Sequence, residues 1–149
     1  MTNPRDYGDV IKNDIIDLCL GKQIGNGAGR DVFEWLPDKT LVAKIEDGSK
    51  SFQNIMEWET WGRVGNVAGV HVWFAACHNI SACGTVLLQE RTSVPAKYPD
   101  KVPAWFTDIK KSNFGMVGNK FVCHDYGVHM MIENGMTKRM RKADWERGW

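Results

Sequence analysis

The sequence predicts an α+β fold in which a five-stranded antiparallel sheet carrying one helix precedes a smaller second part. Three observations predict this class. β-Favouring runs separated by turn residues occupy positions 17–45 and 70–89, and a helical pattern lies between them at 51–64. After them, one further pair of short apolar runs occupies positions 114–124. With 149 residues, the chain is long enough for one domain that buries a sizeable core.

Composition and charge exclude several classes of protein. With 43% hydrophobic and 25% charged residues, the chain is typical of a globular protein. Its formal net charge is +1, so nucleic acid is not an expected partner. No apolar run approaches the ~20 residues that span a bilayer, and residues 1–14 are too polar for a signal peptide. The four cysteines form no Cys-x-x-Cys pair, and we expect a cytoplasmic protein with reduced thiols.

The first three strands are separated by two turns. Strands are expected over 17–24, through Trp35 and over 41–45, with turn chemistry at 37–40. The glycine-rich turn at 25–29 joins two strands, whereas the Walker A loop and the dinucleotide-binding fingerprint need a helix after their glycines. Both are therefore excluded. Glycines at such a turn let backbone N–H groups approach a phosphate without a Cβ in the way.

One helix and two further strands complete the predicted sheet. Residues 51–64 lack proline and carry apolar residues at helical spacing, and Ser51 is a suitable N-cap. Strands are expected over 70–77 and 84–89, around a polar turn at 78–81. These elements complete a predicted five-stranded sheet with one helix.

The last third of the chain contains a predicted hairpin with polar residues at both ends. Two short apolar runs flank Gly118-Asn119, and a two-residue loop containing glycine is typical of a tight hairpin. Such a hairpin carries Asn113 and Asp125 to the same end of the ribbon, with Asp108 close by. Phosphoryl transfer needs this set of groups, because an aspartate orients the acceptor hydroxyl while an Asn and an Asp hold Mg²⁺.

Together these motifs resemble the protein kinase-like superfamily. In chain order they are Gly25-x-Gly27-x-x-Arg30-x-Val32, Val42-Ala43-Lys44, Asp108-x-Lys110-x-x-Asn113 and Asp125-Tyr126-Gly127. They are similar to the glycine-rich loop, the strand with the phosphate-binding lysine, the catalytic loop and the metal-binding Asp-x-Gly. The resemblance covers about residues 17–127, with a small lobe at about 16–92 and a strongly reduced large lobe at about 93–149. Each motif alone is a weak signal, but their order is specific.

The resemblance implies ATP and Mg²⁺ as cofactors and a role for each matching residue. The nucleotide would contact Gly25, Gly27, Val32, Ala43 and Lys44, and backbone groups of Glu90 and Arg91 would pair with the adenine edge. Catalysis would use Lys44, Glu57, Asp108 and Lys110, and the metal would bind Asn113 and Asp125. Glu59 is the alternative to Glu57 as the partner of Lys44. Glu57 is preferred because an apolar residue, Trp61, follows it one helical turn later, as in the family.

The sequence departs from the family at several positions, mainly in its second half. In the first half, Arg30 replaces the third glycine of the loop, and in the second half Phe106-Thr107 replace the usual His-Arg. Three prolines between 95 and 103 argue against the long helices that the family has there. Residues 136–149 are expected to form one basic helix. The chain is therefore interpreted as a minimal kinase-like protein of phage or bacterial type, acting in the cytoplasm (the host cytoplasm if it is phage-encoded).

Two functions stay open from the sequence. The first is phosphate transfer to a Ser/Thr hydroxyl of a protein substrate, and the second is a catalytically silent binding module that inhibits or scaffolds a partner protein. A homodimer or a partner is expected to cover apolar surface left by the reduced large lobe, and no membrane association is expected. A zinc site is not expected, because the spacing fits no usual pattern for the candidate ligands Cys77, His78, Cys83, Cys123 and His124.

Overall fold

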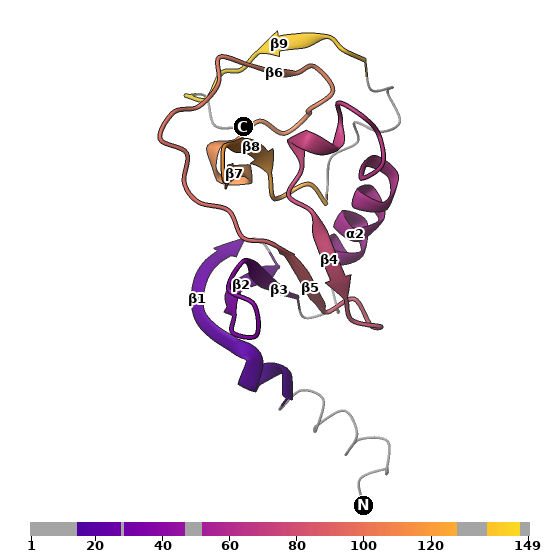
Figure 1. Cartoon of the computed structure of the whole chain (residues 1–149), viewed down its shortest axis with the longest axis vertical. Coiled ribbons are helices and arrows are strands. Elements are labelled where there is room, and N and C mark those ends of the chain that lie inside the picture. Colours follow the sequence, from indigo (N-terminus) through magenta and orange to yellow (C-terminus); the bar gives the residue numbers. More distant parts are fainter. Residues whose placement is uncertain (1–14, 28, 47–51, 128–136, 147–149) are drawn as a thin grey trace, which may run out of the picture.

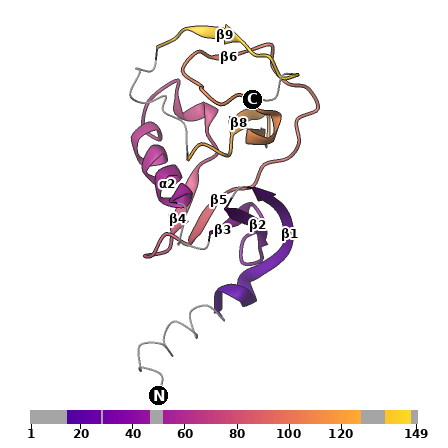
Figure 2. The same ribbon diagram turned by 180° about the vertical axis from the view of Figure 1, so that it is seen from behind.

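The computed structural model describes residues 15–27, 29–46, 52–127 and 137–146. The first part of the chain holds a five-stranded antiparallel sheet and an α-helix, and the second part holds two small two-stranded sheets. The two parts lie one above the other in Figure 1, and Figure 2 shows the same arrangement from behind. This confirms the predicted α+β class. Among the described residues, no helix is long and apolar enough to cross a membrane.

The large sheet follows the predicted meander. From one edge to the other, its strands are β1 (Leu20–Gly27), β2 (Arg30–Trp35), β3 (Leu41–Glu46), β5 (Val86–Glu90) and β4 (Cys77–Ile80). Every neighbouring pair is antiparallel. The first strand begins later than predicted, because residues 15–19 are helical and its partner strand ends opposite Leu20.

The register of the sheet places three of the predicted site residues in one row. Gly25 is opposite Val32, and Val32 is opposite Lys44. Residues directly opposite one another share a face of the sheet, so these three residues share one face. Side chains alternate along a strand, so Val42 lies on the same face as Lys44 whereas Ala43 lies on the other.

Helix α2 (Gln53–Val64) packs against the sheet and most closely against β4. Its buried residues lie three or four positions apart and therefore on one face, and they are Asn54, Glu57, Thr60 and Val64. Three of these four are polar, whereas Phe52 and Met56 are 64% and 40% exposed, so apolar spacing predicted the helix but not its buried face. The predicted N-cap, Ser51, lies outside the described residues. Phe52 occupies the N-cap position and makes no side-chain capping bond.

The stretch 70–81 differs from the prediction of a strand followed by a turn. A short 3₁₀ helix, η1 (His71–Trp73), replaces the first part of the expected strand, and β4 begins only at Cys77. Backbone hydrogen bonds to the carbonyl oxygen of Val67 turn the chain before the strand can start. Residues 78–79 belong to the strand, and their polar side chains are exposed because β4 is the edge of the sheet.

The second part contains the predicted hairpin. Strands β7 (Phe114–Val117) and β8 (Lys120–Cys123) pair with each other, and Gly118 in their turn has a φ of +59°. A short 3₁₀ helix, η2 (Lys111–Asn113), leads into the hairpin. No helix is found at residues 95–103, as the prolines there predicted.

The predicted basic helix at 136–149 is wrong for the part of it that the structure describes. Strand β9 (Met140–Lys142) pairs instead with β6 (Lys101–Pro103). A further backbone hydrogen bond, from the N–H of Ala104 to the carbonyl oxygen of Arg139 at 2.8 Å, continues the ladder. Local composition cannot reveal a strand partner that is distant in the sequence, and this is why the prediction failed.

An aromatic core fills the second part and continues under helix α2. The rings of Phe74 and Trp105 are stacked with centroids 5.5 Å apart, and the buried ring of Tyr126 meets Phe74 edge-on at 4.9 Å. Five tryptophans belong to this core or pack against it, namely Trp58, Trp61, Trp73, Trp105 and Trp145. The tryptophans are therefore mainly structural. Apolar surface was expected in the reduced large lobe, at about 93–149. Of the large apolar side chains described as exposed, only Val94 and Met140 lie in that range.

Candidate functional site

A cleft of about 700 Å³ is lined by residues from both parts of the chain. Its walls come from β1, β2, β3, β5 and the start of α2, from the segment after β5, and from the segments on either side of the hairpin of β7 and β8. Nine of the lining residues were singled out in the sequence, namely Gly25, Arg30, Val32, Lys44, Glu90, Asp108, Lys110, Asn113 and Asp125. The fold therefore brings the glycine-rich turn, the lysine strand and the Asn/Asp hairpin to one site.

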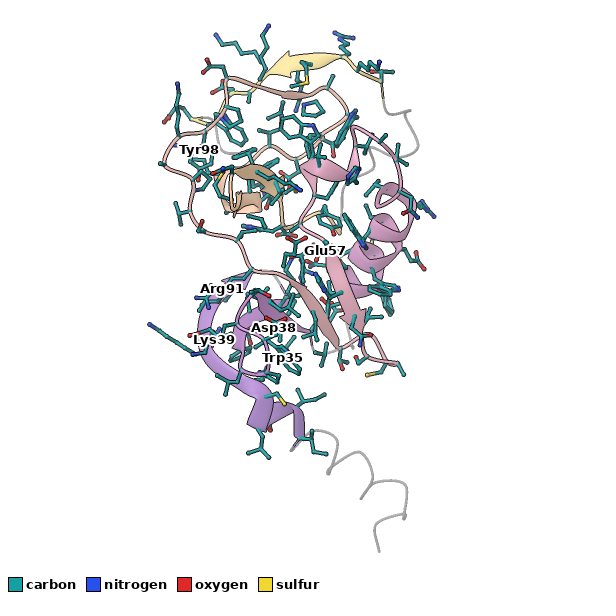
Figure 3. All side chains as sticks on the ribbon, in the orientation of Figure 1. Trp35, Asp38, Lys39, Glu57, Arg91 and Tyr98 are labelled. Atoms are coloured by element: carbon teal, nitrogen blue, oxygen red, sulfur yellow. The ribbon has the colours of Figure 1, made fainter. Side chains whose placement is uncertain are left out.

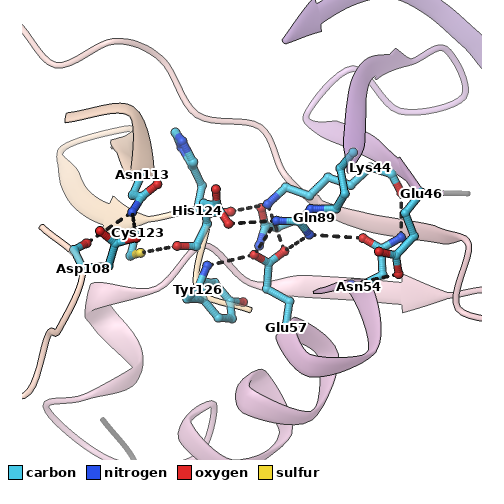
Figure 4. A network of polar contacts seen from close by, with 12 residues as sticks. Lys44, Glu46, Asn54, Glu57, Gln89, Asp108, Asn113, Cys123, His124 and Tyr126 are labelled. Atoms are coloured by element: carbon cyan, nitrogen blue, oxygen red, sulfur yellow. Dashed lines mark hydrogen bonds and ion pairs between the residues drawn. The ribbon is translucent and has the colours of Figure 1, made fainter. Parts of the chain in front are cut away.

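Lys44 and Glu57 form the centre of this site. The Nζ atom of Lys44 lies 2.9 Å from Oε2 of Glu57, and both side chains are buried. The same ammonium donates to the backbone carbonyl oxygen of His124, so it connects the sheet to the hairpin (Figure 4). Figure 3 shows Glu57 at the level where the two parts of the chain meet. Glu59 is exposed, so Glu57 is the glutamate that pairs with Lys44.

The Glu57 carboxylate accepts four hydrogen bonds. Arg30 donates two of them, from Nη1 at 2.8 Å and from Nη2 at 3.0 Å. Lys44 donates the third, and the backbone N–H of Tyr126 donates the fourth at 2.8 Å. Burial alone would raise the pKa of Glu57, but Lys44 and Arg30 outweigh it and lower the pKa to about 2. The carboxylate is therefore ionised and fixed in orientation.

Arg30 is a buried cation that joins Glu57 to Asp125. Besides its two bonds to Glu57, its Nη1 donates to Oδ1 of Asn54 at 3.2 Å, and its Nη2 lies 2.9 Å from Oδ1 of Asp125. Burial alone would lower the pKa of Arg30, but the carboxylates of Glu57 and Asp125 raise it above its ordinary value. The sequence marked Arg30 only as a departure from a glycine. Its partners are 27 and 95 positions away, so local sequence gave no signal of this role.

Asp108, Lys110 and Asn113 form a second group at the cleft. The Nδ2 atom of Asn113 donates to Oδ2 of Asp108 at 3.0 Å and to its backbone oxygen at 3.2 Å. Both oxygens of Asp108 are hydrogen-bond acceptors, so Nδ2 of Asn113 is the atom that faces them. Oδ1 of Asn113 is then on the other side of the amide from Nδ2. Lys110 Nζ lies 3.7 Å from Oδ1 of Asp108. The backbone oxygen of Asn113 accepts from the N–H groups of His124 at 2.8 Å and Asp125 at 3.3 Å, which holds the two groups together.

His124 is a site residue to which the sequence assigned no role at the nucleotide site. Its Nε2 donates to the carbonyl oxygen of Ser112 at 2.7 Å, so Nδ1 is the acceptor for the hydroxyl of Thr92 at 2.6 Å. Burial and the neighbouring Lys44 charge lower the pKa of His124 below its ordinary value. The neutral ring therefore ties the segment after β5 to the segment before β7, across the cleft.

One predicted nucleotide contact lies differently from expectation. Ala43 is wholly buried on the far face of the sheet and does not line the cleft. Val42 lines it instead, and alternation along the strand, counted back from Lys44, could have identified this residue. Gly27 pairs with Arg30 at the end of the β1–β2 ladder, and its exposure lies outside what the structure describes.

The predicted adenine contacts also need correction. The backbone N–H of Glu90 donates to the carbonyl oxygen of Ala76 at 2.9 Å. The backbone N–H of Arg91 donates to the carbonyl oxygen of Thr40 at 2.8 Å. Neither N–H is therefore available to a ligand. Glu90 lines the cleft but Arg91 does not, and Thr92 follows Glu90 along the wall. Residues from the predicted segment therefore line the cleft, but Arg91 is not among them.

The donor set fits a magnesium ion that binds together with phosphate. Asp125 and Asn113 both line the cleft, and the Asp125 side chain is 43% exposed. A carboxylate and an amide oxygen suit Mg²⁺, which usually takes only one or two protein ligands beside phosphate and water. The described residues contain no group of three or more His, Cys, Asp or Glu side chains placed to hold a metal. A magnesium ion here would therefore need the phosphates as further ligands.

Comparison with protein-family models and with curated proteins found no match for this sequence. The family resemblance of the motifs is thus a proposal, and its support comes from the geometry of the cleft. The residues that meet there are a buried lysine–glutamate pair, a buried arginine, two aspartates and an asparagine.

Proposed function

We propose that the chain is an ATP- and Mg²⁺-dependent phosphotransferase of protein kinase-like fold that acts on a Ser/Thr hydroxyl of a protein. One observation carries the proposal. The Lys44 ammonium contacts both Glu57 and the backbone oxygen of the residue before Asp125, in a cleft that Asp108 and Asn113 also line. Turn-forming residues with no shared function have no reason to converge in this way. The kinase-like arrangement accounts for all of them at once.

The first half of the site binds and orients the triphosphate. Gly25 lets the β1–β2 turn approach the phosphates, and Val32 and Val42 offer an apolar surface to the base. Lys44 neutralises the α- and β-phosphates and is held in place by Glu57. Asn113 and Asp125 would hold Mg²⁺, which supplies charge neutralisation on the phosphates. Lys44, Asn113 and Asp125 are held by ion pairs or hydrogen bonds before the ligand arrives, so little reorganisation of them is needed.

The second half of the site handles the acceptor. Asp108 accepts the proton of the acceptor hydroxyl, and the Asn113 amide keeps its carboxylate in place. The acceptor oxygen forms a bond to the γ-phosphorus as the bond to the β-γ bridging oxygen breaks, and ADP leaves with that electron pair. Lys110, 3.7 Å from Asp108, offsets charge on the transferred group. Almost all of the rate gain would come from positioning and electrostatics.

Phosphate transfer from labelled ATP tests this function. The chain is incubated with ATP and Mg²⁺, and phosphorylation of the chain itself or of added protein is followed by mass spectrometry. Lys44→Ala and Asp125→Ala should each abolish transfer. Lys39→Ala is the matched control, because Lys39 is exposed in the turn between β2 and β3, away from the cleft (Figure 3). Unchanged transfer in Lys44→Ala or Asp125→Ala would rule out the function.

A catalytically silent binding module is the second candidate. Two observations favour it, namely that Arg30 already pairs with the Asp125 carboxylate and that the second part has only short strands and 3₁₀ turns among its described residues. A fold alone does not establish activity. Calorimetry distinguishes the candidates, because the module predicts no nucleotide binding at millimolar ATP and Mg²⁺. The enzyme predicts saturable binding together with hydrolysis or autophosphorylation.

A further inference from the structure

Arg30 has the contacts of a fixed structural group. It is 6% exposed at the start of β2, and its guanidinium makes a two-point contact with Glu57 in addition to its bond to Asn54. A fork of this kind matches a carboxylate in geometry and in charge. If Arg30 left, Glu57 would keep only the donors Lys44 and Tyr126 N–H. These bonds hold Arg30 within the first part independently of its contact with Asp125.

The contact with Asp125 uses one end of the guanidinium and one oxygen of the carboxylate. Arg30 Nη2 lies 2.9 Å from Oδ1 of Asp125, and no hydrogen bond to Oδ2 is found within the described part of the chain. The Asp125 side chain is 43% exposed at the cleft, so Oδ2 can be reached by a ligand. A divalent ion bonds to carboxylate oxygen at about 2 Å, and the guanidinium occupies the approach to Oδ1. Only one oxygen is therefore left for metal.

The charges of the inner site are balanced by the chain itself. Lys44 and Arg30 supply two positive charges against the two negative charges of Glu57 and Asp125. A glycine at position 30, as in the family that the motifs resemble, would leave this group with one excess negative charge. Two magnesium ions serve the phosphates in protein kinases. Arg30 supplies, before any ligand binds, part of the positive charge that the second ion provides in those kinases.

We propose that Arg30 is a positioning residue that takes the place of one divalent ion, because it holds Oδ1 of Asp125 and leaves Oδ2 for a single metal. The inference rests on the nucleotide-dependent function proposed above. It predicts that a nucleoside triphosphate binds to this chain with one divalent ion. Replacing the guanidinium by a neutral group of similar size frees Oδ1 of Asp125, so a second divalent ion can bind.

Manganese is the probe, because free Mn²⁺ is counted directly by electron paramagnetic resonance. The full chain is titrated with Mn²⁺ in the presence of one equivalent of AMP-PNP, an ATP analogue that is not hydrolysed, so that no excess nucleotide binds Mn²⁺ in solution. We expect about one Mn²⁺ per chain for the wild type and about two for Arg30→Gln. Arg30→Lys keeps the charge and should stay at about one. Arg63→Gln, a change at an exposed position of helix α2, is the matched control and should equal the wild type.

The possible failures are distinguishable. Two Mn²⁺ per chain in the wild type, or one in a folded Arg30→Gln, overturns the role of Arg30 while nucleotide binding still supports the phosphotransferase. An Arg30→Gln variant that binds AMP-PNP about tenfold more tightly with unchanged Mn²⁺ stoichiometry also overturns it, because Arg30 would then be a competitor of the nucleotide. No AMP-PNP binding by the wild type overturns the proposed function and this inference with it. If Arg30→Gln does not fold, the number of Mn²⁺ ions bound per wild-type chain still tests the role of Arg30.

Discussion

The carboxylate of Glu57 lies 2.9 Å from the ammonium of Lys44, and no part of Glu57 is exposed to solvent. Arg30 and the Tyr126 N–H complete its four donors, so residues from β2, β3 and the segment after β8 all meet on one helical side chain. A buried charge is tolerated only when it is paired and fully hydrogen-bonded, and Glu57 meets both conditions. The stability of the fold and the geometry of the cleft therefore depend on the same residue.

Replacing Glu57 should cost far more stability than replacing its neighbour on the helix. Glu57→Gln leaves Lys44 and Arg30 buried without their shared counter-charge, and removing one member of a buried ion pair typically costs about 3–5 kcal/mol. Glu59→Gln is the matched control, because Glu59 is exposed and such changes usually stay within about 0.5 kcal/mol. Urea unfolding of both variants measures the difference. Equal midpoints would contradict the central position of Glu57.

The pH dependence of stability follows from the same carboxylate. The folded pKa of Glu57 is about 2 against an ordinary value of 4.5, so the unfolded state takes up the proton first as the pH falls. The stabilisation is complete above about pH 4.5 and is lost as the pH drops towards 2. It amounts to roughly 3 kcal/mol. Urea unfolding at pH 6 and pH 3 should show this loss, and Glu57→Gln should show less of it. The same pH dependence in both proteins would disprove the assignment.

The neighbouring lysines Lys110 and Lys111 provide a test of the proposed acceptor half of the site. Lys110 lies 3.7 Å from Asp108, whereas Lys111 pairs with Glu146 at 3.4 Å and lies over the ring of Tyr98. Lys110→Ala should lower kcat for phosphate transfer about 100-fold with little change in the KM for ATP. Lys111→Ala should stay within about twofold of the wild type, because surface pairs contribute little. Steady-state kinetics would contradict this assignment if the two variants were equally impaired.

Much of the site was predictable from the sequence because its groups are carried by local motifs. The hairpin that brings Asn113 and Asp125 together follows from Gly118-Asn119, and the sheet that places Lys44 follows from short runs between turns. The choice of Glu57 depended on the family resemblance, which implies an apolar residue one helical turn after the glutamate. For the hairpin and the sheet, local rules with a short range in the sequence determined the positions.

The features that the sequence did not predict depend on long-range contacts or, in one case, on a strand residue assigned to the wrong face of the sheet. The role proposed for Arg30 depends on its contact with Asp125, which is 95 positions away, and no local sequence rule connects the two residues. Strand β9 forms because β6 offers a partner, although the composition of 136–149 favours a helix. The choice of Ala43 over Val42 was a different kind of error, because strand alternation was available and would have corrected it.

The central claim is that the phosphates of a nucleotide lie against Lys44. The most direct measurement uses an acyl phosphate of ATP, whose acyl group is attacked by the deprotonated amine of a lysine beside the bound phosphates, so that an amide forms and ATP is released. Peptide mass spectrometry then identifies the labelled lysine. The account predicts labelling of Lys44, suppressed by excess ATP and Mg²⁺, while labelling of the exposed Lys39 is not suppressed. Labelling of Lys44 that ATP does not suppress, or suppression confined to other lysines, would contradict it.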